Sequence, residues 1–134
     1  MTSPADLDEL HQAIKRGDLP ALRAYLERGG SIVARDRYGW TPLFMAAKQG
    51  HTPMVRMLLH AGADPNQGGA GGFTPLVAAG LSGSAESVDA LLDAGADPSV
   101  AWGQSLIEVM RQQGRSRIVE LLELALARQR GRAV

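Results

Sequence analysis

Three histidines and one glycine run are the parts of this 134-residue chain with the best claim to chemistry. His11, His51 and His60 are potential metal ligands or general bases, since a neutral imidazole binds zinc and accepts a proton near neutral pH. The run Gly68–Gly72 has the composition of a phosphate-binding loop, but Phe73 follows where such a loop needs a lysine. We therefore interpret the run as a flexible hairpin, because backbone so rich in glycine is costly to order.

Other catalytic chemistry finds little support in the residue types. The sequence contains no cysteine, which excludes thiolate ligands and disulfides. No Ser-His-Asp order, nucleophile elbow or pair of carboxylates in a shared pocket is visible. The formal net charge is zero, which disfavours nucleic-acid binding because duplexes are held through several phosphate contacts. We expect no catalytic residue, no cofactor, no bound metal and no nucleic-acid partner.

Recognition of another protein is the chemistry that remains. Large aromatic side chains and arginine contribute much of the binding energy at protein interfaces. Such residues act together only if the elements that carry them bring them to one surface. The organisation of the chain therefore decides which of them form a site.

The elements of this chain return every 33 residues. Thr41-Pro42-Leu43 returns as Thr74-Pro75-Leu76, and Gly62-Ala63-Asp64-Pro65 returns as Gly95-Ala96-Asp97-Pro98. A weaker copy precedes these two, and another follows at a spacing of 31 residues. A fixed period of this length marks a stacked repeat protein.

Each copy carries the signals of two short helices. Thr41 and Thr74 precede a proline, so their hydroxyls can accept from the free N–H groups of a helix start, and Ser105 keeps this cap in the last copy. Thr52, again before a proline, is expected to cap a second helix in the same way. A glycine ends each helix, where a left-handed residue costs little. The glycines expected to end the first helices are Gly50, Gly83 and Gly114.

The pattern resembles the ankyrin repeat, because signature, spacing and terminator recur in register over about residues 5 to 126. The resemblance implies an all-α solenoid of helix-turn-helix units joined by β-hairpin loops. We expect one domain over 1–134, with outer repeats that are atypical because terminal units turn one face to water. The expected repeats are 5–35, 36–68, 69–100 and 101–127, followed by a basic tail at 128–134.

The histidines take on a structural meaning in this register. Phe44 and Val77 stand where the family motif has a histidine that hydrogen-bonds between hairpins, so we expect weaker polar bridging and more apolar packing there. His11 retains the motif position. His11, His51 and His60 fall at a first-helix start, a second-helix start and a second-helix end, which predicts that they lie too far apart to share a metal ion.

A binding surface is the main functional implication of the resemblance. In the family, hairpin tips and the exposed side of the first helices form a concave binding surface. By register, Tyr38 and Trp40 occupy variable positions of one hairpin, Phe73 matches Trp40 in the next and Trp102 matches Tyr38 in the last. The alternative is that the rings lie flat on neighbouring hairpins and only stabilise the fold. The expected partner-binding residues are Lys15, Arg16, Arg35, Arg37, Tyr38, Trp40, Lys48, Gln49, Phe73, Leu81 and Trp102.

Charge placement points to the nature of the partner. Basic residues fall on the hairpins and first helices and acidic residues on second helices, which predicts a basic face and an acidic partner, unless the asymmetry is an ordinary solvated surface. The function implied is a non-catalytic protein–protein interaction module. The alternative is a dedicated inhibitor or immunity-type protein that occludes the active site of a cognate enzyme. Without a secretory pattern or a membrane-length apolar run, we expect a cytoplasmic location and no membrane contact.

The C-terminal helix poses a separate question. It carries apolar residues on more than one face, and no further repeat follows to bury Leu124 and Leu126. Either the helix end covers the stack as a cap, or it makes a homodimer or partner contact. We favour the cap and a monomer. We interpret Arg128, Arg130 and Arg132 as a frayed basic tail.

Overall fold

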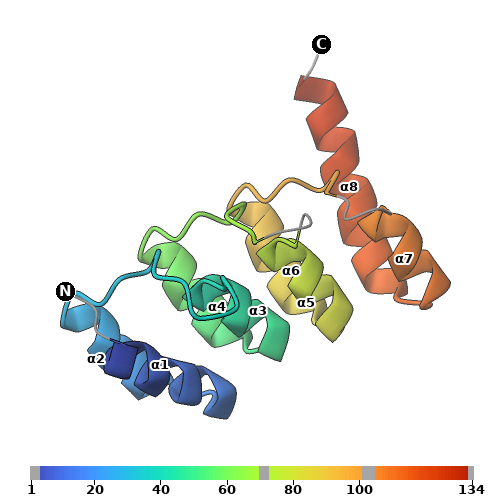
Figure 1. Cartoon of the computed structure of the whole chain (residues 1–134). Coiled ribbons are helices and arrows are strands. Elements are labelled where there is room, and N and C mark those ends of the chain that lie inside the picture. The colour runs from blue at the N-terminus through green and yellow to red at the C-terminus, as the bar shows by residue number, and fades with distance from the viewer. Residues whose placement is uncertain (1–3, 70–72, 101–104, 133–134) are drawn as a thin grey trace.

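The computed structural model describes residues 4–69, 73–100 and 105–132. In these ranges the helices form pairs that lie side by side in chain order, as Figure 1 shows. The predicted all-α solenoid is confirmed. The pairs are α1 (Pro4–Arg16) with α2 (Leu19–Glu27), α3 (Pro42–Gln49) with α4 (Thr52–His60), α5 (Pro75–Ser82) with α6 (Ala85–Asp93), and α7 (Leu106–Gln112) with α8 (Ser116–Arg132).

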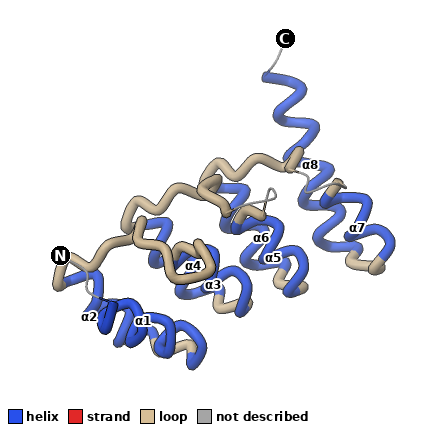
Figure 2. Tube along the Cα trace, in the orientation of Figure 1, coloured by secondary structure: helices blue, strands red, loops and turns tan. Residues whose placement is uncertain are grey.

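The connections differ on the two edges of the stack. Figure 2 shows long loops along one edge and short turns within the pairs along the other. The β-hairpins implied by the family are reduced to turns, because none of the described residues lies in a strand. The hairpin before α3 is closed by the Asp36 N–H, which donates to the Trp40 carbonyl at 3.0 Å, and the next by the Gly69 N–H, which donates to Phe73 at 2.9 Å.

The predicted caps hold for the first helices of the two central pairs. The Thr41 hydroxyl accepts from the Phe44 N–H, and the Thr74 hydroxyl accepts from the Val77 N–H, each at 3.3 Å. After these helices, Gly50 and Gly83 have φ angles of 71° and 79°, a left-handed conformation that suits glycine. The threonine caps and the glycines therefore fix where α3 and α5 begin and end. Because these limits set the register of each helix, they also decide which side chains the helix presents on its surface.

Two other predicted caps are wrong. Ser105 precedes α7, but its side chain makes no capping hydrogen bond. Thr52 is the first residue of α4, and its hydroxyl points to the neighbouring pair, where it lies 2.7 Å from the Ser87 hydroxyl and 3.3 Å from the Ser84 hydroxyl. Because Thr52 and Ser87 are buried, this cluster satisfies polar groups between repeats and fixes how α4 and α6 pack.

The core runs through the middle of the stack. Val55, Leu58 and Leu91 are fully buried on the second helices, and each buried aliphatic side chain of this size contributes about 1.5–3 kcal/mol. Helix α3 packs on α1 on one side and on α5 on the other. A methyl group added at Gly80 would lie 3.2 Å from the Leu106 side chain, so glycine allows α5 to approach α7 closely.

A polar bridge joins the loops that follow α4 and α6. Phe44 and Val77 are buried, so the expected apolar packing is confirmed. The bridging is nevertheless kept by another residue, Asn66. Its amide donates to the Gly95 carbonyl at 3.0 Å, and its oxygen accepts from the Asp97 N–H at 2.7 Å.

The C-terminal segment differs from its prediction. Arg128, Arg130 and Arg132 belong to α8, which is helical to its last described residue, so the interpretation as a frayed tail is wrong for this stretch. Leu122 is buried, whereas the side chain of Leu124 is 55% exposed. Helix α8 contacts the loop after α6 through the Gln129 amide, which donates to Asp97. This contact leaves Leu124, on the same helix, exposed. None of the described helices combines the length and the apolar character needed to cross a membrane.

Candidate functional site

One carboxylate organises the hairpin that precedes α3 (residues 35–41, the Asp36 hairpin). Oδ1 of Asp36 accepts from the N–H groups of Tyr38 at 2.8 Å and Trp40 at 3.0 Å. Oδ2 is buried without a hydrogen bond and lies 3.5 Å from Nδ1 of His11 on α1. Arg35 donates from Nη1 to the Gly39 carbonyl at 2.7 Å. These bonds hold the hairpin that carries two aromatic rings.

The rings of this hairpin continue onto α3 as a stack. The centroids of Tyr38 and Trp40 are 5.2 Å apart, and those of Trp40 and Phe44 are 5.3 Å apart, with tilts of 37° and 34°. Offset aromatic pairs of this kind contribute about 0.5–1.5 kcal/mol beyond burial. The stack is graded in exposure, from Tyr38 at 61% exposed to Phe44, which is buried. It is therefore anchored at one end and available to a partner at the other.

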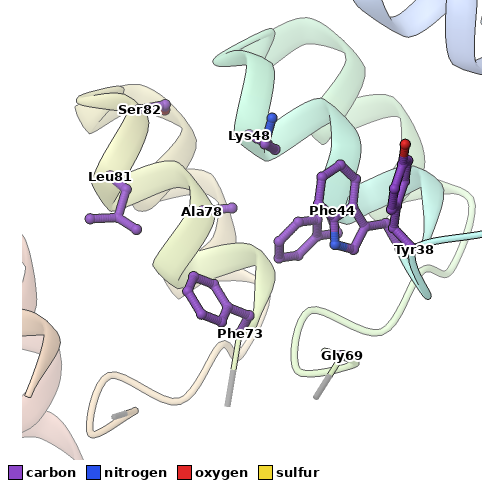
Figure 3. Close-up of a pocket in the computed structure, with 9 residues that line it drawn as sticks. Tyr38, Phe44, Lys48, Gly69, Phe73, Ala78, Leu81 and Ser82 are labelled. Atoms are coloured by element: carbon purple, nitrogen blue, oxygen red, sulfur yellow. The ribbon is translucent and has the colours of Figure 1, made fainter. Parts of the chain in front are cut away.

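The stack forms one wall of a cavity of about 530 Å³ between the second and third repeats, which we name the aromatic pocket. Its other wall comes from α5 and the residues just before it. Figure 3 shows the side chains of Phe44 and Lys48 on α3, with Ala78 and Phe73 on the neighbouring segment. A volume of this size falls within the range of about 300–1,000 Å³ typical of ligand sites. The lining residues are Tyr38, Trp40, Phe44, Lys48, Gly69, Phe73, Ala78, Leu81 and Ser82.

Five of the predicted site residues meet at this pocket. Tyr38, Trp40, Lys48, Phe73 and Leu81 all line it, although they come from two hairpins and two helices. Trp40 and Phe73 also pack against the core, which supports a contribution of these two rings to fold stability, while their role in binding stays a prediction. Trp102 lies outside the described residues.

The other predicted site residues do not line the aromatic pocket. Lys15 and Arg16 are exposed at the end of α1, and Arg16 pairs with Asp18 at 3.5 Å. Gln49 is exposed at the end of α3. The guanidinium of Arg37 lies 5.5 Å from the centre of the Tyr38 ring, outside the cavity, and Arg35 is held by its own hairpin.

The predicted separation of charge between first and second helices is incomplete. Exposed arginines also lie on second helices, at Arg23 of α2 and Arg56 of α4, and exposed acids lie on α1 at Asp8 and Glu9. The predicted basic face therefore stays a prediction, with exceptions on the first two helix pairs. Within the aromatic pocket the positive charge comes from Lys48, whose Nζ lies 5.0 Å from the centre of the Trp40 ring.

The histidines have structural surroundings. His11 faces Asp36, and Nε2 of His51 lies 3.3 Å from the Lys15 carbonyl, joining the first two repeats. Within the described ranges, no group of three histidine, aspartate or glutamate side chains is placed to hold a metal ion.

Sequence reasoning missed four residues of the pocket: Phe44, Gly69, Ala78 and Ser82. A signal for Phe44 was present, because Phe44 and Lys48 are four residues apart in the expected helix and such residues share a helix face. A signal for Ala78 was present too. It stands 33 residues after Met45, so a small side chain replaces a long one at the same repeat position. The space it leaves forms part of the cavity.

A second polar cluster joins the last two repeats. Oδ1 of Asp97 accepts from the Ser99 hydroxyl at 2.7 Å, the Ser99 N–H at 2.9 Å and the Gln129 amide at 3.1 Å. Chiefly the two Ser99 bonds hold the pKa of Asp97 below its ordinary value of 3.8, against the opposing effect of burial, and the Gln129 bond lowers the pKa by a smaller amount. This cluster fixes the end of α8 rather than forming a reactive site.

Helix pairs stacked in chain order and joined by long loops along one edge define a helical repeat solenoid, with the aromatic pocket between its second and third pairs. A family model for ankyrin repeats matches three copies over residues 10–101. The match covers more than half of the chain, which therefore belongs to the ankyrin-repeat family. No curated protein matches the sequence with significance. The pair α7 and α8 lies beyond the matched region, so its assignment as a fourth ankyrin repeat stays a prediction, although it packs on the third pair.

Proposed function

We propose that this chain is a non-catalytic binding module that recognises a partner protein through the aromatic pocket and the first-helix surface around it. Ankyrin repeats are in general protein–protein interaction modules and are typically non-catalytic. What the repeats share is the scaffold, so the site has to be argued from this chain's own surface.

One observation carries the proposal. Four large apolar side chains are exposed in the described part of the chain, and two of them, Tyr38 and Leu81, border the same cavity. The other two, Val33 and Leu124, lie elsewhere. Exposed apolar groups gathered around a concavity mark an interaction site more strongly than scattered ones do.

The pocket is also held ready for a partner. The Asp36 carboxylate fixes the backbone at Tyr38 and Trp40 before any partner arrives, so little backbone freedom in this hairpin remains to be lost on binding. Buried aromatic anchors near the centre of an interface supply most of its binding energy. We therefore expect Trp40 and Tyr38 to contribute more than the exposed charges of α1.

An inhibitor would use the same surface as an adaptor and would differ from it in binding affinity. An antidote to an enzyme binds one partner at nanomolar affinity or tighter, whereas a general adaptor needs only micromolar affinity. A measured dissociation constant for the partner therefore assigns the chain to one of these two roles.

Capture from an extract of the native cell tests the proposal. The test variant combines Tyr38→Ala with Leu81→Ala, and the matched control combines Val33→Ala with Leu124→Ala, so that both lose two exposed apolar side chains. We expect a partner to be captured by the wild type and by the control but not by the test variant, with all three equally folded by circular dichroism. Equal capture by all three proteins would show that the aromatic pocket is not the binding site.

A further inference from the structure

Two positive charges lie over rings of the aromatic stack. The guanidinium of Arg37 lies over the Tyr38 ring at 5.5 Å, and the ammonium of Lys48 lies over the Trp40 ring at 5.0 Å. Among the described residues, neither cation has a carboxylate within ion-pair distance. Lys48 is moreover a lining residue of the pocket. Its charge is thus held at the edge of an apolar cavity without an anion to balance it.

The opposite wall leaves room beside this charge. Ala78 and Leu81 of α5 occupy the repeat positions that Met45 and Lys48 occupy in α3. Met45 is buried, so its side chain fills a space that Ala78 leaves open one repeat later. The α5 side of the cavity is therefore mainly apolar, and the positive charge of the cavity comes from Lys48 on α3.

We propose that the aromatic pocket receives a bulky apolar side chain of the partner protein, and that an aspartate or glutamate next to that side chain pairs with Lys48. This inference rests on the proposed function and specifies the chemistry of the partner. The apolar side chain buries the exposed surfaces of Tyr38 and Leu81, and the neighbouring carboxylate meets the free ammonium at the rim. Arg37 adds attraction from the outer end of the stack.

A cationic ligand is the competing chemistry, because aromatic rings also bind quaternary ammonium groups. Two cations already lie over the rings of this stack, so a positively charged ligand meets repulsion from Lys48 and Arg37. The described lining residues include no acidic side chain to offset that repulsion. The charge of the site therefore favours an acidic segment.

The test is selection of short random peptides displayed on phage against the purified full chain. We expect the enriched peptides to share a bulky apolar residue with an aspartate or glutamate within two positions. Ala78→Met should weaken their binding by at least about tenfold, since it fills the cavity with the side chain that the fold accepts at Met45. Leu124→Ala, outside the pocket, should leave binding unchanged. Leu81→Lys serves as a second pocket variant should Ala78→Met lower the melting temperature.

The role of Lys48 is tested with the same peptides. Lys48→Gln should weaken binding by about threefold to fivefold and reduce its sensitivity to salt, because one partly exposed ion pair is lost. Arg56→Gln, at an exposed position of α4 outside the aromatic pocket, is the matched control and should change neither.

The outcomes distinguish an error in the inferred chemistry of the partner from an error in the assignment of the pocket as a binding site. Enriched peptides that depend on Ala78 but show no acidic preference, or that are rich in lysine or arginine, overturn this inference and leave the pocket as a binding site. Absence of any peptide that distinguishes wild type from the pocket variants overturns both the inference and the assignment of the pocket.

Discussion

The two walls of the aromatic pocket share one scaffold and differ in what they display. Both helices begin after a threonine cap and a proline, and both end at a left-handed glycine. The differences lie at the positions between these signals. Asp36, Met45 and Lys48 of the first wall correspond to Gly69, Ala78 and Leu81 of the second.

This difference shows how a repeat protein makes a site. Scaffold positions repeat because each pair must cap its helices and pack on its neighbours, whereas the surface positions are free to vary. The α3 wall is held by the Asp36 carboxylate and carries the charge of Lys48, whereas the α5 wall is open and mainly apolar. A methyl group added at Gly68 would lie 2.3 Å from the Phe73 carbonyl, so the second hairpin needs glycine at the repeat position that Arg35 occupies in the first.

The largest expected effect comes from removing the central ring of the α3 wall. Trp40→Ala loses contacts with both Tyr38 and Phe44 and opens space next to the core, so we expect the free energy of unfolding to fall by roughly 2–3 kcal/mol. Urea denaturation measures it. Trp40→Phe places there the residue type found at Phe73 and should lose much less. Similar losses for both variants would contradict the ring stack as the source of stability.

The next largest effect concerns the carboxylate that braces the hairpin. Asp36→Ala leaves the N–H groups of Tyr38 and Trp40 without their acceptor, which should lower the free energy of unfolding by about 2 kcal/mol. Asp36→Asn keeps an oxygen acceptor and should retain most of it. Thermal denaturation of both variants checks the order, and an alanine variant as stable as the wild type would show that the hairpin does not need this brace.

Much of the scaffold could be predicted from the sequence, and the site only in part. The caps at Thr41 and Thr74 followed from local chemistry that involves residues three positions apart. The role of Thr52 did not, because its partners, Ser84 and Ser87, belong to the next repeat and are set by how the helices pack. The cavity was missed for the same reason. The cavity lies between α3 and α5 and is lined by Ala78, where the preceding repeat has Met45, so it depends on how these two helices pack.

The contact beneath the two walls gives a smaller effect. Thr52→Val keeps the shape of the side chain but removes the hydroxyl bonded to Ser87, which should lower the free energy of unfolding by about 1 kcal/mol. Thr52→Ser keeps a hydroxyl and should be closer to the wild type. Denaturant titration distinguishes the two. An equal loss in both would assign the effect to the methyl group rather than to the hydrogen bond.

The smallest expected effect concerns the loops that follow α4 and α6. Asp64 and Asp97 occupy the same repeat position, but only Asp97 is bonded to α8, through Gln129. Because the pKa of Asp97 is lowered in the folded protein, its contribution to stability is present above the ordinary value of 3.8 and is lost as the pH falls through the lower folded pKa.

Asp97→Asn should therefore lower stability at neutral pH and make little difference in strong acid, as followed by thermal melts across the acid range. Asp64→Asn is the matched control. A stability difference between wild type and Asp97→Asn that grows on acidification would show that the sign of this linkage is wrong.

Partner binding at the aromatic pocket requires the space beside Ala78. The most direct measurement is the dissociation constant of the captured partner for the wild type and for Ala78→Met, with melting temperatures recorded for both. We predict that the constant rises by at least about tenfold while the melting temperature stays nearly unchanged. An unchanged constant in a folded Ala78→Met protein would show that the partner binds elsewhere.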